Sequence, residues 1–205
     1  MRICHAFLFF SIKFAGGTSD LMYKICKAQI KSGHKPVIYS GDYKFDKVPS
    51  FDVVHLHVFR TFQNYVLWKA CMKHNVPFIM DAHGAVPYGK RKPVLKRLFD
   101  KFWGRQMLRD AAFCVAETKV GVDEYKDVVP DLPDEQIVVI SPPFDTDEFV
   151  TLPEKGLFRK EYGIGSDERV IMFLGRGHHI KGHDLLIKGF AEHAKNDDKA
   201  KLVIV

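Results

Sequence analysis

The residues best suited to chemistry lie in a glycine-rich loop at 175–182, which reads GRGHHIKG. A run of apolar residues at 170–174 precedes this loop, and apolar residues at three- and four-residue spacing follow it, as in a helix. A helix that begins after such a loop presents unpaired N–H groups and the positive end of its dipole to an anion. Arg176 and Lys181 add two full positive charges, so the stretch predicts a site for a phosphate or diphosphate.

Two common phosphate-binding motifs do not fit this loop. Gly177 and Gly182 have the spacing of a Walker A motif, but the dipeptide His183-Asp184 stands where lysine and serine or threonine are required. Ile180 stands where a GxGxxG motif requires its third glycine. Taken alone, the loop therefore leaves a second interpretation open, namely an ordinary strand-to-helix turn with solvated basic residues.

Histidines are the other candidate ligands in the sequence. His179 and His183 are four residues apart, as two zinc ligands on a helix would be, but they straddle the expected start of the helix. No third ligand with cysteine or carboxylate spacing follows them, and neighbouring His178 is placed with the loop. His55 and His57 share one face of a predicted strand, where satisfied histidines of the core or of a cleft edge are the simpler interpretation. The sequence thus predicts no metal site and no cofactor.

Composition limits the class of protein. With 46% apolar and 27% charged residues, a chain of 205 residues can bury a hydrophobic core. No apolar run approaches the roughly 20 residues that span a bilayer. The N-terminal stretch contains His5 and Lys13 and lacks a small-x-small cleavage site, which favours a buried strand over a signal peptide. The four cysteines form no CxxC pair, which predicts reduced thiols and a cytoplasmic location.

Positive charge is concentrated in the first half of the chain. Residues 1–110 contain 19 Lys and Arg against 7 Asp and Glu, whereas residues 111–205 contain 12 against 18. The first half should therefore favour an anionic partner. Nucleic acid is not expected as a partner, because no nucleic-acid-binding motif is present and the sequence has only one basic stripe.

That stripe is the segment 90–109, which contains eight basic residues and one acidic residue. As a helix from Pro93 it places apolar side chains toward one side, which fits an interfacial helix on an anionic membrane. The alternative is a surface helix that packs on the sheet and leaves its basic face in water. The candidate membrane contacts are Lys96, Arg97, Lys101 and Trp103.

Apolar runs alternate with helical patterns along the chain. Strands are predicted at 3–10, 36–40, 52–57, 76–80, 112–116 and 137–140, and helices at 19–32, 62–74, 93–108 and 121–128. This alternation predicts an α/β fold, a Rossmann-like parallel sheet with helices on both faces. Ligands of such sheets bind at the carboxyl ends of the strands, which places Gly16-Gly17, His83-Gly84 and Glu117-Thr118 at one edge.

The pattern changes after residue 140. We expect a first domain at 1–150 and a linker at 151–168 with a short helix near 155–162. A second parallel βαβ unit is expected at 169–205, with strands at 170–174 and 202–205. Two strands and one helix cannot bury one another, so we expect this second Rossmann-like domain to be truncated.

Short segments along the whole chain match those of one enzyme family. They are Gly16-Gly17, Gly33-His34, DVVHLH at 52–57, Val76-Pro77, DAHG at 81–84, DAA at 110–112, Glu117-Thr118, IVVI at 137–140, Asp145, Phe149, Gly175-Arg176 and Lys181-Gly182. With these motifs the chain resembles the group 1, family 4-like, glycosyltransferases. That family has the GT-B fold, two facing Rossmann-like domains with the active site between them. The resemblance implies an N-terminal acceptor-side domain and the start of a C-terminal nucleotide-sugar-binding domain.

The resemblance also implies an activity. Family members transfer a sugar, commonly a hexose, from a nucleotide-sugar to a saccharide or lipid-linked acceptor, most with retention of configuration. Arg176 and Lys181 would hold the donor diphosphate and stabilise the charge that builds on it, so no metal is expected. Gly16 and Gly17 would let the backbone approach the donor closely. His83 would be the active-site histidine that hydrogen-bonds the donor sugar. Further cleft residues would be Glu117, Thr118 and Gly84.

Two further expectations follow from the resemblance. The family setting suggests cell-surface polysaccharide biosynthesis by a cytoplasmic protein in peripheral contact with the membrane. The family's acidic motif and its base pocket would lie beyond Val205, so we expect the 205-residue chain to be inactive alone. The alternative is a non-catalytic carbohydrate- or membrane-binding module that needs a separate donor-domain partner.

Overall fold

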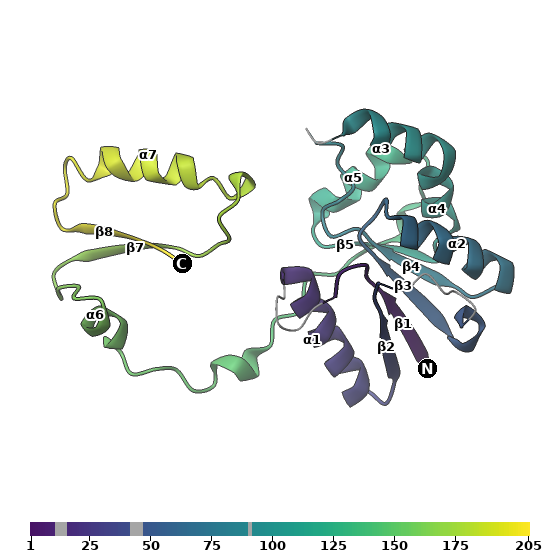
Figure 1. The fold of residues 1–205 in the computed structure, drawn as a ribbon, viewed down its shortest axis with the longest axis horizontal. Coiled ribbons are helices and arrows are strands. Elements are labelled where there is room, and N and C mark those ends of the chain that lie inside the picture. Colours follow the sequence, from purple (N-terminus) through teal and green to yellow (C-terminus); the bar gives the residue numbers. More distant parts are fainter. Residues whose placement is uncertain (11–15, 42–46, 90–91) are drawn as a thin grey trace. The chain divides into compact units, whose positions relative to one another are not determined.

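A computed structural model describes residues 1–10, 16–41, 47–89 and 92–205 (Figure 1). The chain divides into two compact units, Met1–Asp145 and Thr146–Val205. The boundary predicted at residue 150 lies a few residues inside the second unit.

The first unit is built on a six-stranded sheet in which every neighbouring pair is parallel. Its strands are β1 (Arg2–Ala6), β2 (Lys35–Tyr39), β3 (Val53–His57), β4 (Phe78–Asp81), β5 (Phe113–Ala116) and β6 (Ile137–Val139). They lie in the order β2-β1-β3-β4-β5-β6. This confirms the predicted α/β class and its parallel, Rossmann-like sheet.

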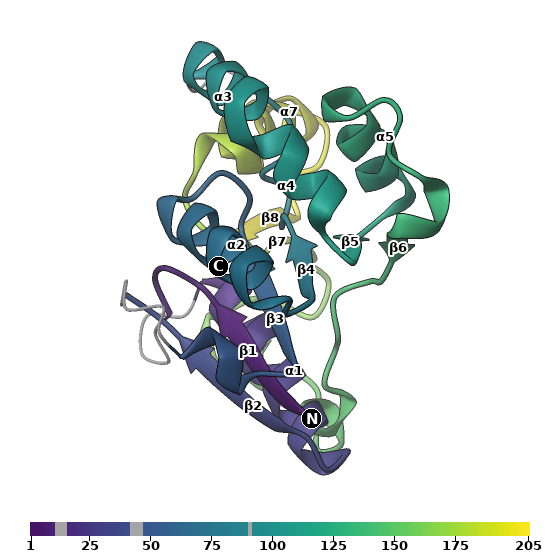
Figure 2. The same cartoon turned by 90° about the vertical axis from the view of Figure 1, so that its right-hand side faces the viewer.

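Helices cover both faces of this sheet. Figures 1 and 2 show α1 (Gly17–Lys31) on one face, beside β1 and β2, and α2 (Phe62–His74) on the opposite face. The main hydrophobic core includes residues of α2, α4 (Arg105–Asp110) and α5 (Lys119–Val128) together with alternate strand residues. Short 3-10 turns occur at Val48–Ser50, Asp134–Gln136 and Thr146–Phe149.

The helix predicted at 93–108 is interrupted. It consists of α3 (Pro93–Phe99), a π-helical turn at Asp100–Gly104, and α4. The turn brings Asp100 to a buried position beside Gly104, where an added Cβ would lie 2.5 Å from the Asp100 carboxylate. A π-turn inside an α-helix commonly marks a position with a specific role, and here it carries the acidic partner of Arg60.

Local sequence explains where the helices begin and end. Thr61 and Thr118 cap α2 and α5, since each hydroxyl accepts a hydrogen bond from the backbone N–H three residues later. At the end of α1, Gly33 has φ +80°, and its N–H and that of His34 donate to the carbonyls of Ile30 and Gln29. This is a Schellman motif, for which glycine is the favoured residue.

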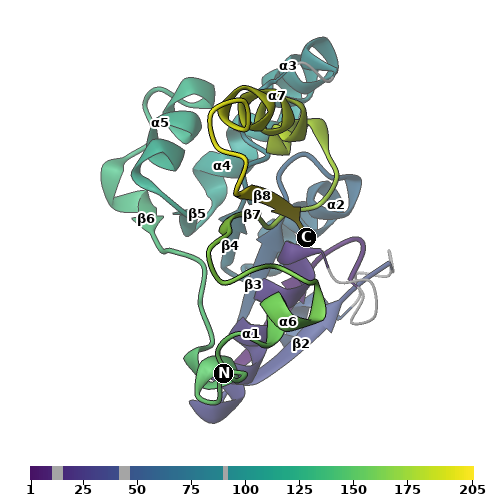
Figure 3. The same cartoon turned by 90° about the vertical axis from the view of Figure 1, so that its left-hand side faces the viewer.

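The second unit contains the predicted strand, loop and helix. β7 (Arg169–Phe173) pairs in parallel with β8 (Ala200–Ile204), and α7 (His183–His193) joins them and lies along this pair (Figures 1 and 3). A 3-10 turn at His179–Lys181 precedes α7, and the expected short helix is α6 (Leu157–Glu161). Within this unit Ala200 alone is buried, as expected for a two-stranded layer with little core.

None of the helices in the described ranges combines the length and hydropathy that a membrane span requires.

Candidate functional site

The strand order places a switch point between β1 and β3. The connection after β1 runs to β2 on one side, whereas the connection after β3 runs to β4 on the other side. Ligands of parallel sheets bind at the carboxyl ends of the strands at such a point. His5 and His57 stand near or at the ends of β1 and β3. His83 is the second residue after β4, and Glu117 is the first residue after β5. The structure therefore brings four polar side chains to one edge of the sheet.

These side chains form one hydrogen-bonded row, which we call the histidine row. It begins on α1, where Gln29 Oε1 lies 2.8 Å from His5 Nε2. His5 Nδ1 lies 3.0 Å from His57 Nε2, and His57 Nδ1 lies 2.8 Å from His83 Nε2. The row ends where His83 Nδ1 lies 2.8 Å from Glu117 Oε1. His5 and His57 are 0% and 1% exposed, so the interior of the row is shielded from water.

Asp81 and His55 border the histidine row. Asp81 Oδ1 lies 3.3 Å from His83 Nδ1, and Asp81 Oδ2 lies 3.8 Å from His55 Nε2. The pKa of Asp81 is raised to about 6, chiefly by burial. The neighbouring His83 lowers this pKa, whereas Glu117 raises it. The His55 ring stacks on His57 with centroids 4.1 Å apart, and its Nε2 has no hydrogen-bond partner within the described residues.

The buried histidines are neutral at pH 7. Burial lowers the pKa of His5, although the hydrogen bond to Gln29 Oε1 counteracts this effect. Burial, with repulsion from the other histidines, holds the pKa values of His55 and His57 well below the ordinary range.

The loop that carries His83 is fixed by its backbone and by Arg60. His83 and Gly84 have φ values of +48° and +70°, so both residues are left-handed, which is uncommon for a histidine. Arg60 Nη1 donates to the carbonyls of Ala85 and Val86, at 2.6 and 2.8 Å. These contacts hold the loop in its strained conformation.

The residues after His57 are held in a similar way. Val58 has φ +64°, which is strained for a β-branched residue. Asn64 of α2 donates from Nδ2 to the carbonyls of His57 and Val58, at 3.0 and 2.8 Å. The Val58 N–H donates to the Asp81 carbonyl, at 2.8 Å. The end of β3 is thus anchored both to α2 and to β4.

A pocket of about 120 Å³ lies beside the end of the row. Its lining includes His83 and the three predicted cleft residues Gly84, Glu117 and Thr118. The predicted cleft residues therefore lie together around the predicted active-site histidine. Both ring nitrogens of His83 are engaged by protein atoms, so a contact between its ring and a sugar hydroxyl would require one of these bonds to open.

The glycines predicted to approach the donor begin α1. Gly16 is the extended residue before the helix, and Gly17 is its first residue. A Cβ added at Gly17 would meet nothing within 4 Å, so packing among the described residues does not require glycine there. Close approach of a ligand to this backbone remains a prediction.

The two predicted diphosphate ligands lie in the second unit. Arg176 and Lys181 are both exposed, and neither forms an ion pair with any described residue. Lys181 ends the 3-10 turn, and Gly182, with φ +73°, precedes the first turn of α7. The side chain of His178 accepts a hydrogen bond from the Ile180 N–H, 3.3 Å away, so it serves the loop itself.

Groups of three potential metal ligands occur in the first unit and not at the loop histidines, as far as the described residues show. The ligand atoms of His5, His55 and His57, and those of His57, Asp81 and His83, lie within 4.8 Å of one another. The pairwise hydrogen bonds of the histidine row already occupy both ring nitrogens of His5, His57 and His83. A bound ion would have to displace those bonds.

Two members of this site, His5 and Gln29, are not predicted as site residues from the sequence. His5 lies in the N-terminal stretch predicted as a buried strand, and Gln29 lies in the helix predicted at 19–32. The strand predicted at 3–10 places His5 near its start, whereas in the structure β1 ends at Ala6, so that His5 lies near the carboxyl end, paired with His55.

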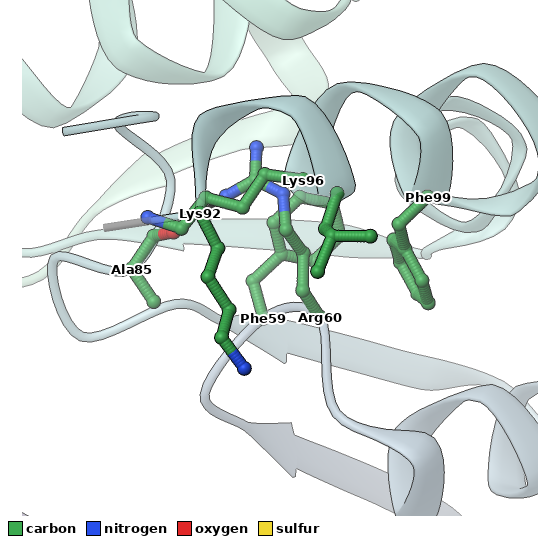
Figure 4. Close-up of a pocket in the computed structure, with 7 residues that line it drawn as sticks. Phe59, Arg60, Ala85, Lys92, Lys96 and Phe99 are labelled. Carbon is green, nitrogen blue, oxygen red and sulfur yellow. Dashed lines mark hydrogen bonds between the residues drawn. The ribbon is translucent and has the colours of Figure 1, made fainter. Parts of the chain in front are cut away.

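A further pocket of the first unit lies beside the basic segment. A pocket of about 470 Å³ is lined by Phe59, Arg60, Ala85, Lys92, Leu95, Lys96 and Phe99. Figure 4 shows Lys92 and Phe99 on either side of Arg60 and Lys96. Lys96 turns inward and donates to the carbonyls of Pro87 and Tyr88, each at 2.9 Å. Residues 90 and 91, which begin the predicted basic segment, lie outside the described residues.

The other predicted membrane contacts of this segment are exposed. Arg97 lies over the Tyr88 ring, Lys101 is exposed, and Trp103 is 41% exposed. Large apolar side chains are exposed on the same segment: Val94, Leu95, Leu98 and Phe102. The segment therefore packs against the first unit in part, with Met107 and Leu108 in the core, and leaves the apolar side chains of its first half exposed.

Comparison with known proteins gives matches in sequence and in fold. Residues 45–143 match the glycosyl transferase 4-like domain. The chain is 28% identical over 168 residues to the D-inositol 3-phosphate glycosyltransferase of Corynebacterium aurimucosum, covering 76% of this chain and 38% of that protein. It is 27% identical over 149 residues to the enzyme of that name from Kineococcus radiotolerans, covering 69% of this chain and 33% of that protein. The chain thus spans less than half the length of these relatives.

Solved structures share the fold. The Anabaena protein HepE in complex with UDP and glucose superimposes with a TM-score of 0.70 at 13% identity, covering 100% of this chain and 60% of that one. WaaG, a glycosyltransferase involved in lipopolysaccharide biosynthesis, superimposes with a TM-score of 0.61 at 14% identity, covering 98% and 62%. The matched glycosyl transferase 4-like domain, the curated relatives and the shared GT-B fold together support the assignment of this chain to the group 1 glycosyltransferases.

Proposed function

We propose that the protein containing this chain transfers a sugar from a nucleotide-sugar to a hydroxyl of a saccharide or lipid-linked acceptor. The observation that carries the proposal is the strand, loop and helix of the second unit, on which Arg176 and Lys181 stand exposed and without ion-pair partners among the described residues. Two further findings support it. The curated relatives are glycosyltransferases by name, and HepE was solved with UDP and glucose.

The proposed chemistry follows from the charges. When the bond between the sugar and the nucleotide breaks, negative charge builds on the leaving diphosphate. Arg176 can hold two phosphate oxygens with its planar guanidinium, and Lys181 adds a point charge beside the start of α7. Fixed cations there stabilise the transition state more than the ground state, which accelerates the reaction. In this mechanism two side chains supply the charge, no metal ion is needed, and the sugar keeps its configuration.

The test replaces the two cations one at a time. In the protein that contains this chain, Arg176→Ala and Lys181→Ala should each lower kcat/KM by about a hundredfold, because each removes a donor aimed at developing charge. Lys188→Ala, at an exposed position of α7, is the matched control and should leave turnover unchanged. Initial rates with a panel of nucleotide-sugars provide the measurement and identify the donor. Wild-type turnover in both variants would contradict the diphosphate role and favour a non-catalytic module.

We also propose peripheral contact of the segment 92–109 with an anionic membrane. Its support is the combination of Lys101 and Arg97 with the exposed apolar side chains Leu95, Leu98 and Phe102. Such a surface can insert apolar groups among headgroups while its cations attract anionic lipid. Lys96 contributes less to this surface, because it turns inward. A lipid-linked acceptor would then be reached at the membrane surface.

The membrane proposal predicts salt-sensitive binding to vesicles. The chain should co-sediment with vesicles that contain phosphatidylserine at low salt and be released as salt increases. The double variant Arg97→Ala/Lys101→Ala should weaken binding by about 2 kcal/mol, roughly thirtyfold, at about 1 kcal/mol for each charge. Lys69→Ala/Lys73→Ala, two exposed lysines on α2, is the control of equal charge. Equal loss of binding in both double variants would show that only net charge matters.

We further propose a cytoplasmic location, at the inner face of the membrane. All four cysteines, Cys4, Cys26, Cys71 and Cys114, are free and buried. Four unpaired thiols suit a reducing compartment.

A further inference from the structure

The histidine row has a fixed order of donors and acceptors. Gln29 Oε1 can only accept, so the hydrogen between Gln29 and His5 belongs to His5 Nε2. His5 is fully buried and its pKa is lowered, so it carries a single ring hydrogen and its Nδ1 must accept. The 3.0 Å contact therefore assigns a hydrogen to His57 Nε2.

The same reasoning passes to the third histidine. His57 is neutral, because burial holds its pKa well below the ordinary range, so with a hydrogen on Nε2 its Nδ1 must accept. The hydrogen of the 2.8 Å contact therefore belongs to His83 Nε2. At its other nitrogen, His83 Nδ1 faces Glu117 Oε1 at 2.8 Å and Asp81 Oδ1 at 3.3 Å. Carboxylate oxygens accept, so this nitrogen also carries a hydrogen.

We propose that His5 and His57 are positioning residues that hold His83 as a doubly protonated imidazolium at the carboxyl end of β4. Because the buried rings of His5 and His57 are neutral and each accepts a hydrogen bond at Nδ1, both ring nitrogens of His83 carry a hydrogen. The positive charge is balanced by Glu117 and Asp81, and it borders the pocket lined by Gly84, Glu117 and Thr118.

The surroundings support a role in positioning. The rings of His57 and His83 are parallel, with an interplanar angle of 0° and centroids 5.1 Å apart, so the row keeps one orientation. The backbone carbonyl of His57 is held by Asn64, and the loop after His83 is held by Arg60. Neither His83 nor His57 can rotate without breaking a buried hydrogen bond.

The catalytic use of the charge on His83 rests on the proposed function. A cation at this position would attract the anionic part of a donor and stabilise the negative charge that develops on it during transfer. The charge itself is a property of this chain and can be measured without turnover.

The first experiment is ¹⁵N NMR of the histidine rings in the wild-type chain at pH 7. We expect His83 to show two protonated ring nitrogens, and His5 and His57 to show hydrogen on Nε2 alone; His83→Asn assigns the His83 signals. Hydrogen on Nδ1 alone in all three rings, which a reversed Gln29 amide would produce, would overturn the proposal. So would an unprotonated His83 Nδ1 facing a protonated Glu117. Tight Zn²⁺ binding that abolishes these signals would likewise replace the row with a metal site.

A matched pair of variants tests positioning. His57→Gln offers an amide N–H toward His5 and a carbonyl toward His83, so His83 should keep both hydrogens. His57→Leu offers neither, and the signal of protonated His83 Nε2 should disappear. Equal spectra of His83 in the two variants, at equal tryptophan fluorescence, would overturn the positioning role.

Activity separates this inference from the proposed function. In the protein that contains this chain, kcat should fall at least tenfold more in His57→Leu than in His57→Gln. Absence of transfer in the wild type with every nucleotide-sugar would overturn the proposed function while the NMR result stands. Transfer with equal kcat in both variants would overturn the catalytic use of the charge alone.

Discussion

Replacing Arg60 by leucine should lower the free energy of unfolding of the unit Met1–Asp145 by about 3 to 5 kcal/mol, because it leaves a buried carboxylate unpaired. Arg60 Nε and Nη2 donate to the two oxygens of Asp100, at 2.8 and 2.6 Å. Their side chains are 6% and 1% exposed. The guanidinium also binds two carbonyls of the loop after His83, so the loss would loosen the candidate site as well.

Urea unfolding followed by tryptophan fluorescence measures this effect. Both tryptophans, Trp68 and Trp103, belong to the first unit, so the signal reports that unit. Arg105→Leu, at an exposed position of α4, is the control and should stay within about 0.5 kcal/mol of the wild type. A second change, Asp100→Leu, should restore part of the stability of Arg60→Leu, because no charge then remains buried. Equal unfolding midpoints for Arg60→Leu and Arg105→Leu would contradict the role of the pair.

Acidification from pH 7 to pH 5 should destabilise the same unit by about 3 to 5 kcal/mol. His5, His55 and His57 have lowered pKa values when folded, so on unfolding they take up protons below their ordinary pKa near 6.5. Each such group removes up to about 1.4 kcal/mol of stability per pH unit as the pH falls below that value.

Asp81 acts in the opposite direction. Its pKa is raised to about 6, so the folded state binds its proton more tightly than the unfolded state does. Stability from this group increases as the pH falls from about 6 toward 4, by up to about 1.4 kcal/mol per unit. Three histidines outweigh one carboxyl, so the net change is a loss.

Unfolding in urea at pH 7, 6 and 5 measures the slope. His57→Gln removes one of the titrating groups and should make the slope shallower by up to about 1.4 kcal/mol per pH unit. His74→Gln, at an exposed position at the end of α2, should leave the slope unchanged. A wild-type midpoint that does not move between pH 7 and 5 would show that these histidines are not buried as neutral rings.

Much of the fold could be predicted from sequence because its signals are local. The helix predicted at 62–74 has these same bounds in the structure, and Thr61 caps its start. The helix predicted at 93–108 was wrong in one respect, the π-turn at Asp100–Gly104. That turn depends on the pairing of Asp100 with Arg60, forty residues earlier in the chain, and no local pattern reports it.

In the candidate site, too, some features follow from local sequence and others only from the fold. The sequence by itself determined the parallel α/β class, the place of His83 after a strand, and the place of Arg176 and Lys181 in a loop between a strand and a helix. These features could be predicted because glycine-rich turns after apolar strands are recognised within a few residues. Only the tertiary structure decided that Gln29, His5 and His57 stand behind His83. Their contacts span 24 to 52 residues of chain and arise only when parallel pairing aligns β1, β3 and β4. The protonation of a buried histidine depends on such neighbours, and these are set by the fold.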